Sequence, residues 1–165
     1  MTESDFTLIE RELSVQLPPD YRRVLADYPF PHDRDNADSL LYGDSQAIID
    51  RNRDYRAGFA GLPKWPEHYF FIGDDGAASC YFLDLRREPS PVYFADHGAV
   101  DKLAEEAPDL ETWVERTIDD FRRDGIDPFA DAPPSATGLH PALVLLTIAA
   151  VSAGVGYTLF RLFWP

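Results

Sequence analysis

The stretch FFIGDDGAASCYFLDL, residues 70–85, places three carboxylates, Asp74, Asp75 and Asp84, within an aromatic run. Carboxylates at this density are the groups that bind divalent cations or transfer protons in acid–base catalysis. A calcium loop of the EF-hand type needs an oxygen ligand at its third position and glutamate at its twelfth. Counting from Asp74, these positions hold Gly76 and a leucine. The motif fails, and Asp and Gly between two aromatic strands predict a hairpin turn instead.

Two enzymatic alternatives stay open on the sequence alone. Asp96 and His97, taken with Asp84, could form a metal site, although aspartates at strand ends more often bond backbone amides. A hydrolase would draw its acid–base groups from the same part of the chain, namely Asp74, Asp75, Asp84 or His97. The hydrolase is tested by whether a divalent metal raises the melting temperature, because a ligand that binds only the folded state stabilises it.

Other catalytic signals are missing from the sequence. The four histidines lack the i, i+4 pairing of a helical zinc motif. The single cysteine, Cys80, has no His or Lys beside it in the chain and is expected to be a small core residue. No nucleophile-elbow, phosphate-loop or dinucleotide motif occurs. We therefore expect a protein that is not an enzyme and that binds neither metal nor cofactor.

The elements that position these residues begin with three predicted helices. Phe6, Ile9 and Leu13 recur at helical spacing behind polar residues, which predicts a first amphipathic helix. In LPPDYRRVLADYP the paired prolines mark the start of a second helix, whose apolar stripe comprises Tyr21, Val24, Leu25 and Tyr28. A short strand is expected at residues 40–42, followed by a third helix over DSQAIIDRNRDYR, capped by Asp44 or Ser45.

Strands are predicted after the third helix. They cover residues 69–72, 80–85 and 92–95, separated by GDDGAAS and RREPSP. DKLAEEAPDLETWVERTIDDF, residues 101–121, has helical composition throughout, with a break expected at Pro108. This order predicts an α+β fold in which helices flank an antiparallel sheet.

The charge of the chain restricts its partners. Its 165 residues contain 29 acidic and 15 basic side chains, for a formal net charge of −14. Such a chain is a poor ligand for nucleic acid, because binding phosphates requires clustered Lys and Arg. A basic protein would be attracted to it. A single cysteine also excludes an intramolecular disulfide framework and a Cys-rich zinc site.

The C-terminal part predicts a membrane anchor. Residues 141–160, PALVLLTIAAVSAGVGYTLF, contain no charge and are long enough as a helix to cross a bilayer. We expect a globular domain at residues 1–126, a proline-rich linker at 127–140, a transmembrane helix at 141–160 and a short tail at 161–165. The span includes Leu143, Val144, Ile148, Gly154, Gly156 and Phe160. Its small residues have the spacing of helix–helix contacts, which supports a homo-oligomer only weakly.

The opening residues MTESDFTLIE lack the basic and apolar regions of a secretory signal. We therefore expect a single-pass membrane protein whose globular domain lies on the cytoplasmic side.

Three segments together resemble the SUKH superfamily (SMI/KNR-like). IERELSVQLPPDYRRVLADYP, residues 9–29, is similar to its opening signature, in which Leu-Pro-x-Asp-Tyr starts the second helix. FFIGDDGAASCYFLDLRREPSPVYFADHG, residues 70–98, is similar to the second signature, and residues 101–121 to the closing helix. One departure is DYPFPHD, where the family often has Asn-Gly-Gly. The resemblance covers residues 4–123.

The resemblance implies a non-enzymatic protein-binding module. Bacterial members of this superfamily act largely as immunity proteins that bind and neutralise toxins, and a fungal branch regulates cell-wall glucan synthesis. We therefore expect a membrane-tethered immunity protein whose partner is a basic toxin domain. The alternative is a membrane-anchored regulatory scaffold of envelope or cell-wall synthesis. The residues expected to contact the partner are exposed and mostly acidic: Asp33, Asp35, Asp74, Asp75, Asp96 and His97.

Overall fold

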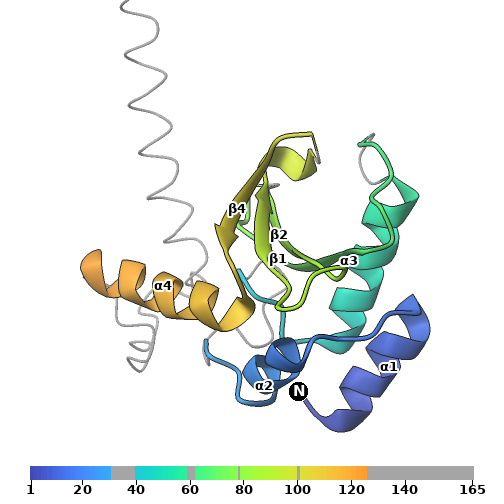
Figure 1. The fold of residues 1–165 in the computed structure, drawn as a ribbon, viewed down its shortest axis with the longest axis horizontal. Coiled ribbons are helices and arrows are strands. Elements are labelled where there is room, and N and C mark those ends of the chain that lie inside the picture. The colour runs from blue at the N-terminus through green and yellow to red at the C-terminus, as the bar shows by residue number, and fades with distance from the viewer. Residues whose placement is uncertain (31–39, 59–61, 78, 100, 126–165) are drawn as a thin grey trace, which may run out of the picture. The chain divides into compact units, whose positions relative to one another are not determined.

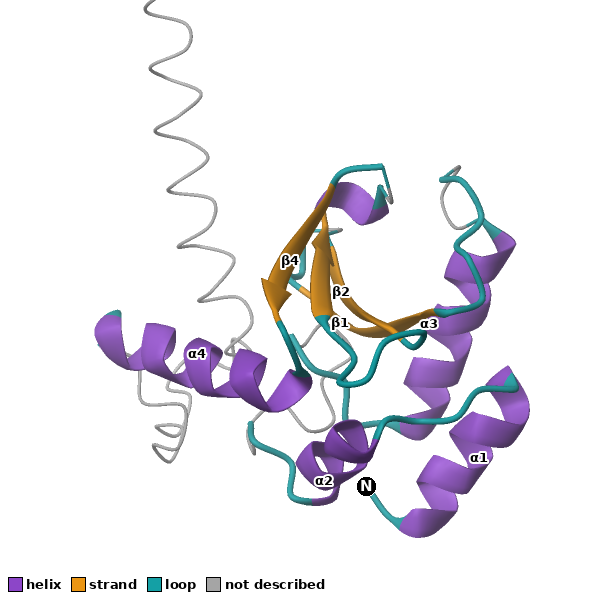
Figure 2. Cartoon of the chain, viewed as in Figure 1, coloured by secondary structure: helices purple, strands orange, loops and turns teal. Residues whose placement is uncertain are grey.

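The computed structural model describes residues 1–30, 40–58, 62–77, 79–99 and 101–125. All of them belong to the first of the two units into which the chain divides, Met1–Ala130. The described chain forms an α+β fold around one antiparallel sheet, as expected from the sequence (Figures 1 and 2). The helices are α1 (Glu3–Leu13), α2 (Pro19–Ala26), α3 (Ser45–Ala57) and α4 (Leu110–Arg123).

The start of each helix follows from local chemistry. Thr2 and Asp5 form a reciprocal capping box at α1. Proline occupies the first position of α2, where its missing N–H costs nothing. Asp44, one of the two predicted caps of α3, accepts a hydrogen bond from the Ala47 amide at 2.7 Å. These signals lie within a few residues of each helix, which is why the sequence predicted all three.

The sheet has the strand order β1-β2-β3-β4, with every neighbouring pair antiparallel. Its strands are β1 (Tyr69–Asp74), β2 (Cys80–Asp84), β3 (Val92–Ala95) and β4 (Leu103–Ala107). The short 3-10 helix η2 (Asp96–Gly98) connects β3 toward β4. The predicted hairpin is confirmed, but β1 runs two residues further than expected and includes Gly73 and Asp74.

Helices lie on both faces of the sheet. Neighbouring side chains of a strand point to opposite faces. Phe71 stacks on Tyr55 of α3, whereas Phe70 contacts Tyr21 of α2 edge to face at 5.2 Å. On the second face Trp113 of α4 also packs against β2. The sheet is therefore the middle layer between α3 on one side and α2 with α4 on the other.

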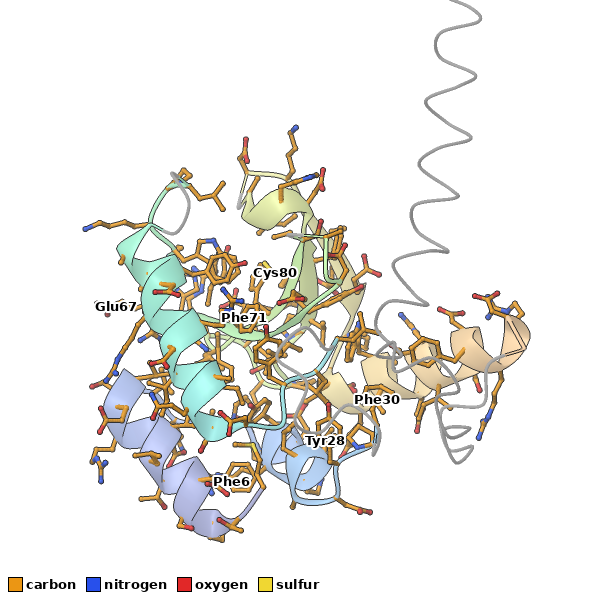
Figure 3. The ribbon with its side chains drawn as sticks, turned by 180° about the vertical axis from the view of Figure 1, so that it is seen from behind. Phe6, Tyr28, Phe30, Glu67, Phe71 and Cys80 are labelled. Carbon is orange, nitrogen blue, oxygen red and sulfur yellow. The ribbon has the colours of Figure 1, made fainter. Side chains whose placement is uncertain are left out.

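The interior is rich in aromatic side chains from segments far apart in the sequence. Phe6, Tyr28, Phe30, Phe71 and Cys80 all point inward and are at most 6% exposed (Figure 3). The expectation that Cys80 is a core residue is confirmed. Burial raises the pKa of its thiol to about 12, so the thiolate that nucleophilic chemistry needs is not available near neutral pH.

The strand predicted at residues 40–42 is wrong. This segment has no strand conformation, and its link to the sheet is a hydrogen bond of 2.8 Å from the Tyr42 amide to the carbonyl of Ile72. The next position along this edge of β1 is Phe71, and its backbone groups already have a hydrogen-bond partner in Asn52. The buried side chain of Asn52 accepts from the Phe71 amide at 2.9 Å and donates to the Phe71 carbonyl at 3.1 Å. Because Asn52 binds both backbone groups of Phe71, residues 40–42 cannot pair with this position as a strand.

The helix predicted from residue 101 is also wrong in its first part. Leu103–Ala107 forms β4, and the helix starts only after Pro108, where Asp109 caps α4 through the Thr112 amide at 2.7 Å. The composition LAEEA favours a helix, but helical propensity is worth only tenths of a kcal/mol per residue. Pairing with the free edge of β3 outweighs that preference.

Several expectations fall on residues outside the described ranges. These are the linker at 127–140, the transmembrane helix at 141–160, the tail at 161–165 and the loop that contains Asp33 and Asp35. Among the described residues, no helix combines the length and apolar composition that a membrane span requires.

Candidate protein-binding site

Four of the six predicted contact residues lie together at one end of the sheet. Asp74 ends β1, Asp75 begins the turn to β2, and Asp96 with His97 forms the start of η2 directly after β3. We call Asp74, Asp75, Ser79, Asp96 and His97 the sheet-end cluster. Antiparallel pairing explains the arrangement, because the register joins Asp74 to Cys80 and Cys80 to Ala95. Asp33 and Asp35 lie outside the described residues.

The carboxylates of the β1–β2 turn are held by amides of the turn and, for Asp74, also by the hydroxyl of Tyr42. Asp74 accepts hydrogen bonds from the Gly76 amide at 2.9 Å and from the Tyr42 hydroxyl at 2.8 Å. Asp75 accepts from the amides of Ala77 at 2.8 Å and Ser79 at 3.1 Å. These are the self-bonding turn contacts typical of aspartate. Each carboxylate is thus fixed in orientation, while Asp75 stays exposed.

Ser79 joins this turn to η2. Its hydroxyl donates to Asp96 Oδ1 at 3.3 Å and accepts from the His97 amide at 3.2 Å. The His97 ring nitrogen Nδ1 lies 2.6 Å from the same Asp96 oxygen, and His97 has a left-handed backbone with φ of 48°. The Asp96 and His97 side chains remain exposed, so the cluster presents fixed polar groups at the surface.

Asp84 does not belong to this cluster. It ends β2 at the opposite end of the sheet, where it pairs with Tyr69 in the register and is 4% exposed. Arg86 donates to it from Nε at 3.0 Å and Nη2 at 2.7 Å. Within the described part of the chain, no group of three or more His, Cys, Asp or Glu side chains could hold a metal ion. The site built from Asp84, Asp96 and His97 is therefore wrong, because the fold separates its members.

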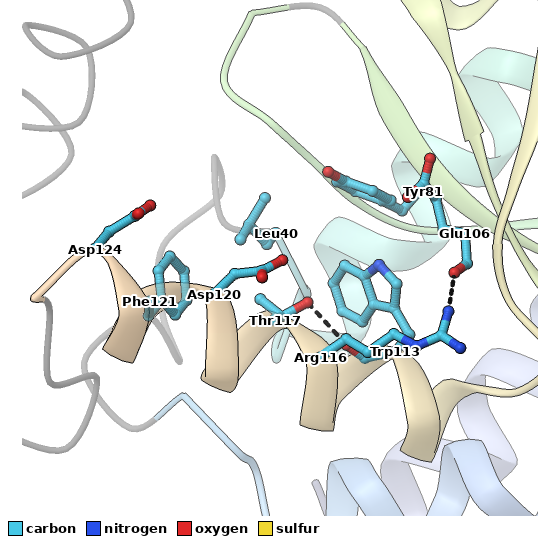
Figure 4. A pocket seen from close by; sticks show the side chains of 9 residues that line it. All are labelled: Leu40, Tyr81, Glu106, Trp113, Arg116, Thr117, Asp120, Phe121 and Asp124. Carbon is cyan, nitrogen blue, oxygen red and sulfur yellow. Dashed lines mark hydrogen bonds between the residues drawn. The ribbon is translucent and has the colours of Figure 1, made fainter.

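A second surface feature was not anticipated from the sequence. A pocket of about 390 Å³ lies between α4 and the face of the sheet that α4 covers (Figure 4). We call it the α4 groove. Its apolar lining comprises Leu40, Tyr81, Trp113 and Phe121, and its polar lining comprises Glu106, Arg116, Thr117, Asp120 and Asp124.

Tertiary contacts hold the walls of the α4 groove in place. The rings of Tyr81 and Trp113 lie 5.0 Å apart, which fixes α4 against β2. Arg116 donates to the backbone carbonyl of Glu106 at 2.7 Å and so ties α4 to β4. In Figure 4 the Glu106 and Asp120 side chains lie on either side of the Trp113 ring. The groove therefore combines an aromatic floor with an acidic rim.

Acidic side chains outnumber basic ones in the lining of the α4 groove, with Glu106, Asp120 and Asp124 against Arg116. Burial, together with the charges of Asp75 and Glu106, raises the pKa of Tyr81 to about 12. Asp75 belongs to the sheet-end cluster and Glu106 to the groove, so both features act on the same side chain. The cluster and the groove thus form neighbouring parts of one acidic surface.

Sequence reasoning missed the α4 groove because its walls come from segments far apart in the chain. One signal was present in the sequence. Asp124 follows the C-terminal end of α4, where the helix dipole disfavours negative charge, whereas Asp119 and Asp120 pair with Arg122 and Arg123. Residues that break such a local rule are often retained for function.

Comparison with known families gives a match over most of the chain. A family model described as SMI1 / KNR4 family (SUKH-1) matches residues 1–116. The match includes all four strands of the sheet and the first half of α4. No curated protein and no solved structure matches the chain.

Proposed function

Since the chain belongs to the SMI1 / KNR4 family (SUKH-1), we propose that it is a protein-binding module of the immunity type, which binds and neutralises a basic toxin domain. The family assignment agrees with the resemblance to the SUKH superfamily that the sequence carries. The observation that supports the proposal most is the set of fixed, outward-facing carboxylates at the sheet end, next to the acid-rimmed α4 groove.

The hydrogen bonds of the sheet-end cluster favour binding over chemistry. Asp75 and Asp96 each use Oδ1 for contacts within the cluster, and both residues are exposed, so a partner can reach them. Because the turn already orders these side chains, a partner that binds them has less conformational entropy to remove. Pre-ordered carboxylates suit a surface that recognises basic groups.

The proposed mechanism is occlusion of the toxin. The net charge of −14 attracts a basic toxin over distances of about a Debye length and raises the association rate, by about 10-fold to 1,000-fold for strongly steered pairs. Once bound, the module covers the surface with which the toxin engages its own target. No bond is made or broken in this mechanism.

The tether is a separate part of the proposal. The uncharged residues 141–160 would hold the module at the membrane, with the globular domain on the cytoplasmic side. A module placed there would meet a toxin as it enters the cell.

Co-purification of the full-length chain from its own membranes in mild detergent tests this function. We expect a basic protein in near-stoichiometric amount that is toxic when expressed alone and harmless when co-expressed with this chain. A stable complex with an enzyme of envelope synthesis would instead support the regulatory scaffold and contradict the immunity role.

Salt dependence tests the steering mechanism with that purified pair. We expect the association rate constant to fall about tenfold between 20 mM and 300 mM salt, because ions screen the exposed carboxylates. The D75N/D96N double variant should associate more slowly at low salt and show a weaker salt dependence, whereas E115Q on α4 serves as a single-charge control. A rate that does not change with ionic strength would contradict steering.

A further inference from the structure

We propose that the α4 groove binds one arginine side chain of the protein partner, with the guanidinium held by the acidic rim and the aliphatic stem and planar group packed on the aromatic floor. This inference rests on the proposed function and names the chemistry by which the module would recognise its partner.

The floor of the groove suits a flat cation. Trp113 and Tyr81 provide adjacent aromatic rings, and Leu40 and Phe121 add apolar surface on the lining. Arginine stacks on aromatic faces through its planar, weakly hydrated guanidinium, whereas the lysine ammonium is a compact and strongly hydrated charge. The aromatic lining, formed by Tyr81 and the largely buried Trp113, therefore favours arginine over lysine.

The rim supplies the opposite charge. Glu106, Asp120 and Asp124 line the groove against one basic residue, Arg116, whose guanidinium is engaged by the Glu106 backbone carbonyl. Asp120 pairs with the exposed Arg123 at 2.8 Å. Among the described residues, neither Glu106 nor Asp124 has an ion-pair partner, so these two carboxylates are available to a guanidinium.

The charge of the groove favours a basic occupant over an acidic one. Residues 31–39 contain three aspartates and one arginine, and residues 126–140 contain two aspartates and neither Lys nor Arg. A net negative segment would be repelled by the rim, whereas a basic partner would be attracted. Charge complementarity thus identifies the occupant as part of a basic protein.

The size of the groove limits what it can hold. A volume of about 390 Å³ lies at the lower end of the roughly 300–1,000 Å³ range of small-ligand sites. This space suits one long side chain with its immediate neighbours. Such a buried arginine anchor within a broader acidic contact is typical of interface hot spots.

Two matched peptides test the proposal on the full-length chain. One is the capped pentapeptide Ala-Leu-Arg-Leu-Ala, and the other replaces its arginine with citrulline, which keeps the shape but removes the charge. The chain is labelled with 5-fluorotryptophan in mild detergent, and its three tryptophans are followed by fluorine NMR. The W113F variant assigns the Trp113 resonance.

We expect the arginine peptide to shift the Trp113 resonance saturably and the citrulline peptide to bind at least about tenfold more weakly, because it forms no charge-assisted hydrogen bond. The E106Q/D124N double variant should weaken binding of the arginine peptide by about tenfold. The E115Q variant removes a charge from the same helix outside the groove and should leave the affinity within about twofold.

Three results would overturn the proposal. They are an unchanged Trp113 fluorine resonance with the arginine peptide, equal affinity for the two peptides, or an equal loss of affinity for the arginine peptide in E115Q and E106Q/D124N. These results are independent of the toxin assay, because the titration contains no toxin. A toxin that binds normally while the peptides fail would contradict the arginine anchor alone, and peptides that bind while no toxin exists would contradict the immunity role alone.

Discussion

Gly73 allows the segment at residues 40–41 to cross strand β1 in backbone contact. A Cβ atom at this position would lie 1.9 Å from the carbonyl oxygen of Leu40 and 2.9 Å from the amide nitrogen of Leu41. Because both neighbours are backbone atoms, neither can move aside by changing a rotamer. The GDDG stretch therefore contains two glycines with different tasks: Gly73 permits a close approach, and Gly76 adopts a φ of 72° in the turn.

We predict that G73A lowers the free energy of unfolding by about 3 kcal/mol or more, because the backbone of residues 40–41 must move away from β1 to make room for the Cβ atom. G76A is the matched control, since a Cβ there meets no atom within 4 Å and costs only about 1 kcal/mol for its positive φ. Urea unfolding of the full chain in mild detergent measures both. If G73A and G76A lose the same free energy of unfolding, contact with residues 40–41 does not require glycine at position 73.

The Asp84 carboxylate contributes a pH-dependent stability. Hydrogen bonds from the Arg86 side chain, aided by the Arg86 amide, lower the pKa of Asp84 in the folded protein despite the opposing effect of burial. The pKa of Asp84 is therefore lower in the folded state than its value of about 3.9 in the unfolded state. The stabilisation is present above about pH 3.9 and is lost as the pH falls through the folded-state pKa.

We predict that D84N is less stable than the parent chain at pH 7, by on the order of 1 kcal/mol, because Arg86 is solvent-exposed. The difference should shrink below about pH 4, where the unfolded state takes up the proton first, and vanish once the pH is below the lowered folded-state pKa. Unfolding free energies measured between pH 7 and pH 2 test this, with D101N as a surface control. A difference that does not change across this range would refute the assignment.

The link between helix α3 and the edge of the sheet depends on Asn52. This side chain is 1% exposed and also donates to the carbonyl of Ile48 in its own helix at 2.9 Å. By binding both backbone groups of Phe71, it closes part of the free edge of β1. An open edge strand is a site for unwanted pairing between chains, so this contact serves both stability and solubility.

We predict that N52A costs about 2 to 4 kcal/mol, because it leaves the Phe71 amide and carbonyl buried without partners. The exposed neighbour Asp54 on the same helix provides the control D54A, which should change stability by no more than about 0.5 kcal/mol. Chemical unfolding gives the energies, and light scattering shows whether N52A also aggregates. A loss below about 1 kcal/mol would mean that other groups satisfy the Phe71 backbone.

For the whole molecule, the uncharged segment at residues 141–160 predicts where the chain resides. We expect the full-length chain to sediment with membranes and to resist extraction by alkaline carbonate. A variant with Leu146 and Ile148 replaced by Arg should be released, because each central arginine opposes insertion by about 2.5 to 3.5 kcal/mol. Extraction of the parent chain by carbonate would contradict the anchor.

Local sequence signals determined much of this protein. The helices α1, α2 and α3, the β1–β2 hairpin and the strand at residues 92–95 follow from apolar spacing, caps and turn residues that act over a few positions. The family resemblance and the acidic character of the surface were likewise present in the chain itself. The four candidate residues from the turn and η2 meet because antiparallel pairing brings together segments that the sequence already marked as strands.

Only the tertiary structure decided the remaining features. Residues 103–107 became a strand because β3 offered a free edge, and residues 40–42 did not, because Asn52 had taken the edge of β1. Asp84 was separated from Asp96 by the direction of the strands, and the α4 groove arose where a helix, a hairpin and Leu40 meet. Each outcome depends on contacts between distant segments, whose energies exceed the local preferences that a linear sequence displays.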